Sequence, residues 1–238
     1  MTKVIAPVAA LLILLNACGG GSEQPDKATV PGVPSTAPVA TDPYIGYYSN
    51  MVVVDDIPGV EMELWLRADS SYVLRETHRG PEAFPAGTFG RWHVVDGLLA
   101  TGSGTDKPEF WRVTENGLLN VGEDGQDFTD GTHNLLTRVP NVVMNEIPVM
   151  RVRGRYRYAA NSHSFEPTGS GRDFPLAVAE LALEMEQRFA ERKNPQAAFL
   201  CGEMECMLTV GPAMEGNGTD EYLYAVRFVR ELPPAECE

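Results

Sequence analysis

The chain has 238 residues and a formal net charge of −14, from 33 acidic and 19 basic residues. An acidic surface of this size lacks the cations that would release phosphate counterions, so the composition disfavours nucleic acid, and we expect no nucleic-acid partner. No stretch after residue 17 is apolar enough to span a bilayer. The chain beyond residue 43 is long enough for one large domain or two small ones.

The N-terminal segment has the three-part pattern of an export signal. Lys3 supplies the positive charge, residues 4–15 form an apolar run, and small or neutral residues follow. The run is too short to span a bilayer, which takes about 20 residues, so we predict that residues 1–17 are a signal peptide. Residues 15–18, Leu-Asn-Ala-Cys, resemble a lipobox, whose cysteine thiolate accepts a diacylglycerol. We therefore predict cleavage before Cys18 and a covalent lipid on it, with no other cofactor; the alternative is an ordinary secretory signal and a chance cysteine.

Residues 18–43 are predicted to be the lipidated cysteine and a disordered tether. Residues 19–43 hold five prolines and almost no large apolar side chain, so they bury too little surface to offset their ordering entropy. Fully extended, such a segment reaches on the order of 75 Å. Gly19, rather than Asp, follows Cys18, which in lipoproteins of Gram-negative type implies sorting to the outer membrane. We expect a lipid anchor on the periplasmic face of that membrane, held by its acyl chains.

Residues 44–139 are predicted to form an antiparallel β-meander. In residues 60–67 apolar and polar side chains alternate with period two, and a second run follows at residues 72–77. Turn signals recur at Ala68-Asp69-Ser70, Asp96-Gly97, Asn116-Gly117 and Asp124-Gly125. Seven or eight short strands in under 100 residues indicate a small barrel or sandwich.

Residues 140–148 are predicted to be a proline-bounded connector, and residues 149–238 a second domain of different character. Asp173-Phe174-Pro175 has the features of a helix start, and the predicted helix runs to about Lys193. Strands are expected before it, at 150–159 and near 163–166, and after it, at 197–210 and 221–231. Strands, one helix and then strands suggest an OB-like α+β barrel.

Besides Cys18, the chain has three cysteines, Cys201, Cys206 and Cys237. Three is an odd number, so at most one intramolecular bridge forms and one thiol is left over. In one straight strand Cys201 and Cys206 would point to opposite faces, too far apart to bond. If residues 202–205 are instead a hairpin loop, these two cysteines can bridge. Either cysteine could also bond to Cys237, and the residues alone leave the pairing open.

Several stretches resemble the NlpE-type lipoproteins, also called copper-homeostasis or envelope-stress lipoproteins. In the first half they are Gly46-Tyr47-Tyr48, the segment from Asp55 to Leu66, Asp69, Tyr72-Val73-Leu74 and Gly90-Arg91-Trp92. In the second half they are Gly154-Arg155-Tyr156-Arg157-Tyr158, Phe165 and Gly171. The resemblance implies a lipocalin-like N-terminal barrel, a C-terminal OB-fold domain and an outer-membrane anchor. It also implies that the protein reports envelope stress, surface contact or copper to a sensor kinase.

The chain departs from this family at its cysteines. Family members commonly carry Cys-x-x-Cys where this chain has Val54 and Ile57, which offer no thiolate for Cu(I) and no redox switch. The family's C-terminal disulfide is also altered, because Cys237 is present but its usual partner position resembles Thr168. The resemblance therefore gives no support for copper binding by the barrel.

Several other groups of residues contain side chains that bind metals or ligands in some proteins, and we interpret them first as structural. Cys201, Met204, Cys206 and Met207 place four sulfur atoms in seven residues; a Cu(I) or redox site is the minor reading, and a disulfide with core methionines the main one. Residues 123–130 lack EF-hand spacing and read as a solvated turn. The four histidines, His78, His93, His133 and His163, show no metal-ligand spacing. We expect Trp65, Trp92 and Trp111 to fill a barrel core. The alternative is that they line the barrel mouth and contact a ligand there.

The sequence contains no hydrolase elbow, P-loop or dinucleotide fingerprint, so we do not expect an enzyme. The leading hypothesis is an envelope lipoprotein that senses or relays stress (surface contact, copper or lipoprotein trafficking) by contact with a sensor kinase or another envelope protein. The alternatives are a lipocalin-like carrier of an apolar small molecule or lipid, and copper buffering by the C-terminal sulfur atoms.

Overall fold

The computed structural model describes residues 42–54, 57–80, 83–103, 107–128, 134–192, 197–213 and 216–237. The predicted signal peptide, Cys18 and the tether up to residue 41 lie outside the described residues. In the described part of the chain, no helix is both long enough and apolar enough to cross a bilayer. We use N-module for the described residues from 42 to 139 and C-module for those from 147 to 237.

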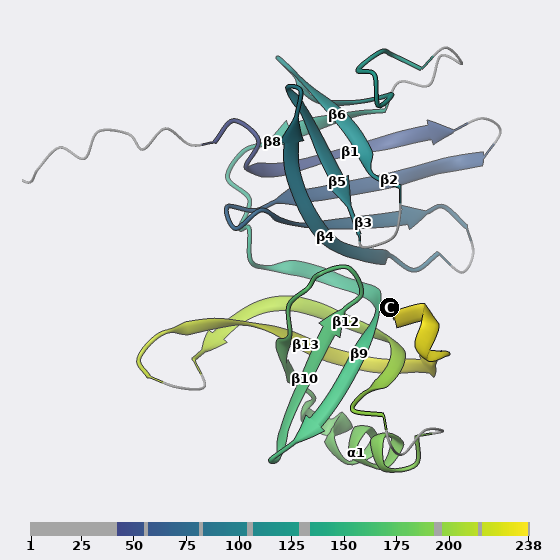
Figure 1. Cartoon of the computed structure of the whole chain (residues 1–238), viewed down its shortest axis with the longest axis vertical. Coiled ribbons are helices and arrows are strands. Elements are labelled where there is room, and N and C mark those ends of the chain that lie inside the picture. The colour runs from purple at the N-terminus through teal and green to yellow at the C-terminus, as the bar shows by residue number, and fades with distance from the viewer. Residues whose placement is uncertain are drawn as a thin grey trace, which may run out of the picture. The chain divides into compact units, whose positions relative to one another are not determined.

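The N-module is a closed antiparallel barrel (Figure 1). Its eight strands within the described residues are β1 (Gly46–Val54), β2 (Ile57–Leu66), β3 (Ser71–His78), β4 (Ala86–Val95), β5 (Leu98–Gly102), β6 (Glu109–Thr114), β7 (Gly117–Val121) and β8 (Leu135–Val139). Each strand pairs with the next in chain order, and β8 also pairs with β1. The ring therefore closes through β1 and β8, and the predicted small antiparallel barrel is confirmed.

Period-two patterning explains how the barrel fills its interior. On β2, Met62, Leu64 and Leu66 are buried in a core that also contains Trp92 and Trp111. The turns follow the predicted signals; in the β4–β5 turn, Asp96 and Gly97 both have positive φ, as a type I′ hairpin turn requires.

The C-module is a second, smaller closed barrel with OB topology. Its elements are β9 (Ile147–Ala159), β10 (Ser162–Pro167), β11 (Phe174–Ala177), the short 3-10 helix η1 (Ala179–Leu181), α1 (Ala182–Ala190), β12 (Leu200–Pro212), β13 (Thr219–Glu231) and the 3-10 helix η2 (Pro234–Cys237). The strand order within the described residues is β9-β10-β11-β13-β12 and back to β9, with β11 and β13 parallel. The helix lies between β11 and β12, as an OB fold requires. The prediction of a mainly β chain with one OB-like α+β module is thus confirmed.

The predicted helix start is wrong. Phe174–Ala177 is a strand, because Phe174 and Leu176 alternate into the core while β11 pairs with β10 and β13. The α-helix begins only at Ala182 and ends at Ala190, with Met185 buried. Proline at position 175 is compatible with a short strand segment as well as with a helix start, so the local signal was ambiguous.

The two modules are joined by one hydrophobic cluster that contains residues of both and by one backbone ladder. Ala86 of β4 pairs in parallel with Arg151 of β9, and the Arg151 amide donates to the Pro85 carbonyl at 2.7 Å. On the outer face of the N-module barrel, Trp65, Val73 and Phe89 are buried in the same cluster as the C-module core. The first strand of the C-module begins at Ile147, two residues before the predicted limit of 149. The described modules are therefore packed on each other.

Candidate functional site

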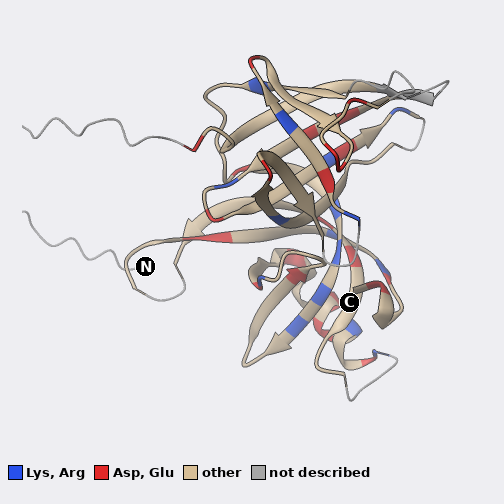
Figure 2. Ribbon diagram, turned by 45° about the horizontal axis from the view of Figure 1, so that its top comes forward, with Lys and Arg blue, Asp and Glu red and all other residues tan. Residues whose placement is uncertain are grey.

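The outer face of the C-module carries a ladder of alternating charges, which we call the arginine ladder. It consists of Arg151, Arg153 and Arg155 on β9, Glu203 and Glu205 on β12, and Arg227 and Arg230 on β13. Because β12 lies between β9 and β13 in the sheet, each glutamate is flanked by arginines from both sides. Figure 2 colours the basic and acidic residues along the ribbon.

Both glutamates are almost fully buried, and hydrogen bonds from guanidinium groups satisfy them. Glu203 accepts from Arg153 at 3.3 Å and from Arg230 at 2.9 Å. Glu205 accepts from Arg151 at 2.9 Å and from Arg227. Desolvation alone would raise the pKa of Glu203, but the hydrogen bonds from Arg230 and Arg153 outweigh it and lower that pKa.

The pKa of Glu205 is also lowered, chiefly by its hydrogen bond from Arg227. Both carboxylates therefore stay ionised at neutral pH.

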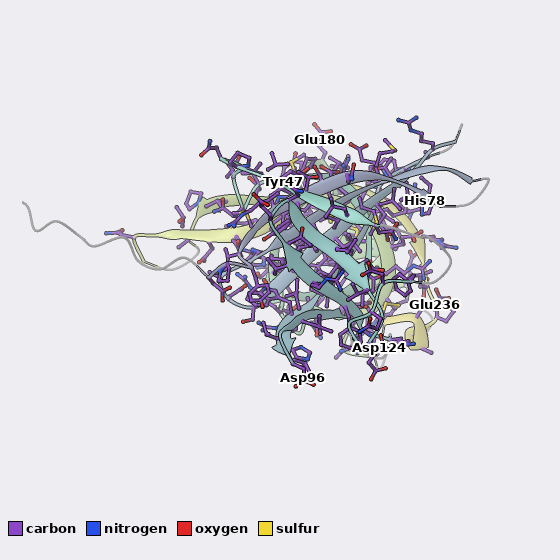
Figure 3. The ribbon with its side chains drawn as sticks, turned by 90° about the horizontal axis from the view of Figure 1, so that it is seen from above. Tyr47, His78, Asp96, Asp124, Glu180 and Glu236 are labelled. Carbon is purple, nitrogen blue, oxygen red and sulfur yellow. A yellow bond between two sulfur atoms is a disulfide. The ribbon has the colours of Figure 1, made fainter. Side chains whose placement is uncertain are left out.

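At one end of this ladder lies a cleft of about 630 Å³, which we call the arginine cleft. It is bounded by β4 and the loop before it, by β9, β12 and β13, and by η2. Figure 3 labels Glu236, which lies on η2. Its lining residues are Phe84, Ala86, Gly87, Thr88, Ser103, Arg151, Arg153, Thr168, Glu203, Arg230, Ala235 and Glu236. Residues from both modules therefore form its walls.

Among the described residues, the charged lining of the arginine cleft is three guanidinium groups and two carboxylates, a net charge of one positive. Arg153 and Arg230 keep about half of their side-chain surface exposed, at 53% and 56%. Glu203 is turned into the ladder and only 9% of its side chain is exposed. The other lining carboxylate, Glu236, is 43% exposed and lies 3.7 Å from Arg153, so it offsets part of the accessible positive charge. In a chain with a net charge of −14, this net positive lining is a local reversal of sign.

Two lining residues hold a buried polar atom that has no hydrogen-bond partner among the described residues. They are Nε of Arg151 and Oγ1 of Thr168. The Arg151 guanidinium also lies over the Phe84 ring, 4.9 Å from its centroid. A buried polar group without a partner costs free energy, so such atoms mark a place where an acceptor would be stabilised.

The structure joins Cys201 to Cys237 in a disulfide, which is one of the pairings that the sequence left open. The bridge fastens η2 to β12, where both cysteines pack with Leu232 in a small buried cluster. The partner of Cys237 is therefore Cys201, and Thr168, at the position where the family resemblance places a cysteine, lines the arginine cleft instead.

Residues 202–205 are not a hairpin loop, because Cys201 and Cys206 both lie on β12. Cys206 is a free thiol and is buried with Met204 in the core of the C-module. Burial raises the pKa of the Cys206 thiol to about 12, so it is not a thiolate at neutral pH. The predicted sulfur ligands are therefore divided between a disulfide and the core, and Met207 is only partly buried.

The other predicted positions are placed as follows. Val54 pairs with Ile57 at the β1–β2 turn, where the family has its cysteine pair. His78 and His93 are exposed, and His133 lies outside the described residues. In the described part of the chain, no three His, Cys, Asp or Glu residues are grouped to hold a metal ion.

His163 is packed rather than exposed. Its Nδ1 lies 2.7 Å from the Tyr156 hydroxyl, and its ring is in contact with the rings of Tyr156 and Tyr158. Desolvation lowers the pKa of His163, and the nearby Glu186 carboxylate only partly opposes it. At neutral pH the ring is uncharged and serves packing.

Sequence reasoning missed the arginine ladder and the arginine cleft, although a local signal was present. Arginine recurs at every second residue from Arg151 to Arg157, which places four guanidinium groups on one face of a strand. What could not be seen locally is that β12 supplies glutamates opposite them and that β4 of the other module closes the cleft.

Comparison with known proteins gives the following similarities. One family model, described as the NlpE N-terminal domain, matches residues 48–130, and another, the NlpE C-terminal OB domain, matches residues 146–238. The curated protein "Lipoprotein NlpE" of Escherichia coli (strain K12) is 25% identical over 127 residues, covering 51% of this chain and 52% of that protein. The chain thus aligns with about half the length of this relative.

Two solved structures are also similar. The first is described as the crystal structure of the Cpx pathway activator NlpE from Escherichia coli; it is 18% identical, covers 78% of this chain and 95% of its own, and has a TM-score of 0.32. The second is a putative lipoprotein from Shewanella oneidensis, 21% identical, covering 42% of this chain and 92% of its own, with a TM-score of 0.36. The two family models match residues in both modules and are the basis for assigning the family. The two solved structures, with TM-scores of 0.32 and 0.36, do not contribute to that assignment.

Proposed function

Because this chain belongs to the NlpE family, we propose that it is a lipid-anchored envelope protein that reports envelope stress by contact with another protein. The observation that carries the proposal is the match of both modules, in order, to the N-terminal and C-terminal domains of that family. The Escherichia coli relative is described as a Cpx pathway activator, and we propose a role of the same kind here.

The proposed anchor is the lipid on Cys18, and the proposed tether is residues 19–43. Two acyl chains hold a protein on a membrane where one does not, and a tether of this length lets the two modules reach a partner at a distance. We propose the periplasmic face of the outer membrane as the location, and a sensor kinase or another envelope protein as the partner.

The packing of the two modules supports a relay rather than two independent binding units. Trp65, Val73 and Phe89 belong to the N-module but are buried in the core of the C-module. Arg67 of the N-module is also paired with Glu221 on β13, and Arg172 holds the same carboxylate at 2.6 Å. A contact made by one module is thus in a position to shift the packing of the other.

Two rival functions have less support. A carrier of an apolar ligand needs an open barrel, whereas large buried side chains such as Trp92, Trp111 and Leu118 pack together inside this one. Copper buffering needs accessible thiolates, whereas Cys201 is in a disulfide and Cys206 is buried as a thiol.

The proposal is tested by deleting the gene and following a transcriptional reporter of envelope stress under copper and under surface contact. We expect a weakened response to at least one stimulus, restored by the wild-type chain but not by Cys18→Ser. An unchanged response to both stimuli would remove the proposal. Titration of Cu(I) into the reduced protein and native mass spectrometry for a co-purified lipid test the two rival functions in parallel.

A further inference from the structure

We propose that the arginine cleft binds a small organic anion through an oxyanion group of the phosphate or carboxylate type. This inference goes beyond the stress-reporting role and does not depend on it, because it rests on the geometry of the cleft alone.

The charge in the cleft favours an anion. The half-exposed guanidinium groups of Arg153 and Arg230 present donors to the cleft, while Glu203 accepts from both on its buried side. A guanidinium has five donors in a planar fork, so its bond to one glutamate leaves others for a second oxyanion. Glu203 therefore positions the two arginines and does not saturate them. Glu236 also pairs with Arg153, at 3.7 Å, so Arg230 keeps more of its donors for a ligand than Arg153 does.

Two further donors on lining residues have no partner among the described residues, Nε of Arg151 and the hydroxyl of Thr168. Both atoms are buried, so they reach a ligand in the cleft only when their side chains turn. Rotation of Thr168 about its Cα–Cβ bond changes where this hydroxyl points, and an oxyanion in the cleft offers it an acceptor. Relief of an unpaired buried donor adds to the affinity of such a ligand. Guanidinium and hydroxyl groups together suit the several oxygens of a phosphate or carboxylate.

The size of the cleft indicates that the oxyanion is attached to an organic body. A volume of about 630 Å³ lies within the range of small-molecule sites, roughly 300–1,000 Å³, and a bare phosphate fills only a small part of it. Phe84, Ala86 and Ala235 supply apolar surface beside the arginines. The expected ligand therefore has a charged group for the arginines and an apolar or aromatic part for these side chains.

The test uses the mature chain, residues 18–238 with Cys18→Ser, and follows amide chemical shifts by NMR during titration. The probes are phenyl phosphate, benzoate, its neutral counterpart benzamide, and inorganic phosphate. We expect saturable shifts around the cleft with phenyl phosphate or benzoate, weaker binding of inorganic phosphate, and none with benzamide. Binding should weaken as salt is raised, because the guanidinium groups are partly exposed.

Two arginines on β13 provide a matched pair of variants. Arg230 and Arg227 are each bonded to a buried glutamate and are 56% and 60% exposed, but only Arg230 lines the cleft. We expect Arg230→Gln to weaken phenyl phosphate or benzoate binding about tenfold and Arg227→Gln to change it less than about twofold. Thermal unfolding of each variant shows that the fold is kept.

Thr168→Val is a second variant, which conserves shape and removes the unpaired hydroxyl. We expect it to keep or raise the stability of the free protein and to weaken anion binding. The proposal is overturned if benzamide binds as well as benzoate, if Arg227→Gln weakens binding as much as Arg230→Gln, or if no probe gives saturable shifts. If Arg230→Gln fails to fold, unchanged affinity in Thr168→Val overturns it instead.

Discussion

At the scale of single residues, the C-module keeps two carboxylates inside its surface by giving each of them arginine donors on both sides. Only 6% of the Glu205 side chain is exposed, yet Arg151 and Arg227 both donate to it. Removing an ionised carboxylate from water is costly unless charged donors replace the water. The arginines thus make the burial of Glu205 tolerable, and the glutamate fixes their positions.

We predict that Glu205→Gln lowers the free energy of unfolding at pH 7 by about 1–2 kcal/mol. The effect is modest because Arg151 and Arg227 are partly exposed, so water solvates their charges when the carboxylate is removed. The folded pKa of Glu205 lies below its ordinary value of 4.5. Its ionised form therefore stabilises the fold above about pH 4.5, and this stabilisation is lost as the pH falls through the folded pKa.

Urea unfolding at pH 7 and pH 3 checks this prediction, and the gap between wild type and Glu205→Gln should shrink at pH 3. Glu184→Gln is the control, because Glu184 forms an exposed pair with Arg188 one helical turn away and should matter little at either pH. A gap that is as wide at pH 3 as at pH 7 would show that charge is not the cause.

Two buried tryptophans form another matched pair. The Trp111 indole N–H donates to the Thr101 hydroxyl at 3.0 Å, whereas Nε1 of Trp65 has no partner among the described residues. Both rings are at most 2% exposed. We expect Trp111→Phe to destabilise the protein by about 1–2 kcal/mol more than Trp65→Phe, because only the first substitution strands a hydrogen-bond partner. Equal losses in chemical denaturation would contradict this reason.

At the scale of elements, η2 is held by the disulfide between Cys201 and Cys237, which are 36 positions apart in the sequence. The bridge closes the loop that contains β12 and β13, and η2 in turn supplies Ala235 and Glu236 to the arginine cleft. The disulfide thus stabilises the hairpin and one wall of the cleft together.

A loop of this length predicts that the disulfide contributes about 3–4 kcal/mol, through restriction of the unfolded chain. We expect reductant to lower the urea midpoint of the wild-type protein and to leave that of Cys201→Ala unchanged. Cys206→Ala is the control: it should retain the response to reductant, since Cys206 is a free thiol. Loss of the response in Cys206→Ala would mean that the pairing is different in solution.

Local patterns in the sequence predict most of the strands but not their long-range partners. Alternation along residues 60–67 and the Asp96-Gly97 turn follow from side-chain period and backbone sterics alone, and both are present. The helix start predicted at Phe174 and Pro175 was wrong because a short alternation of apolar residues cannot be distinguished from a helix start by local sequence. The strand is recognised only when its pairing with β13 is known. The disulfide partner and the arginine cleft depend on contacts between distant segments, such as Ala86 with Arg151, that no local pattern contains.

At the scale of the whole molecule, the described modules share a core, so their stabilities should be linked. Phe89 of the N-module packs against Phe174 of the C-module, with ring centroids 5.8 Å apart. The chain also offers one natural probe for each module. Its three tryptophans all lie in the N-module, and the free thiol of Cys206 is buried in the C-module.

The coupling of the two modules is the central claim behind a relay, and one measurement tests it most directly. Unfold residues 18–238, carrying Cys18→Ser, in urea, and follow tryptophan fluorescence and the reactivity of the Cys206 thiol in the same samples. We predict coincident midpoints, with Phe89→Ala lowering both together. Two separated transitions, or a Phe89→Ala shift seen by one probe only, would contradict a shared core.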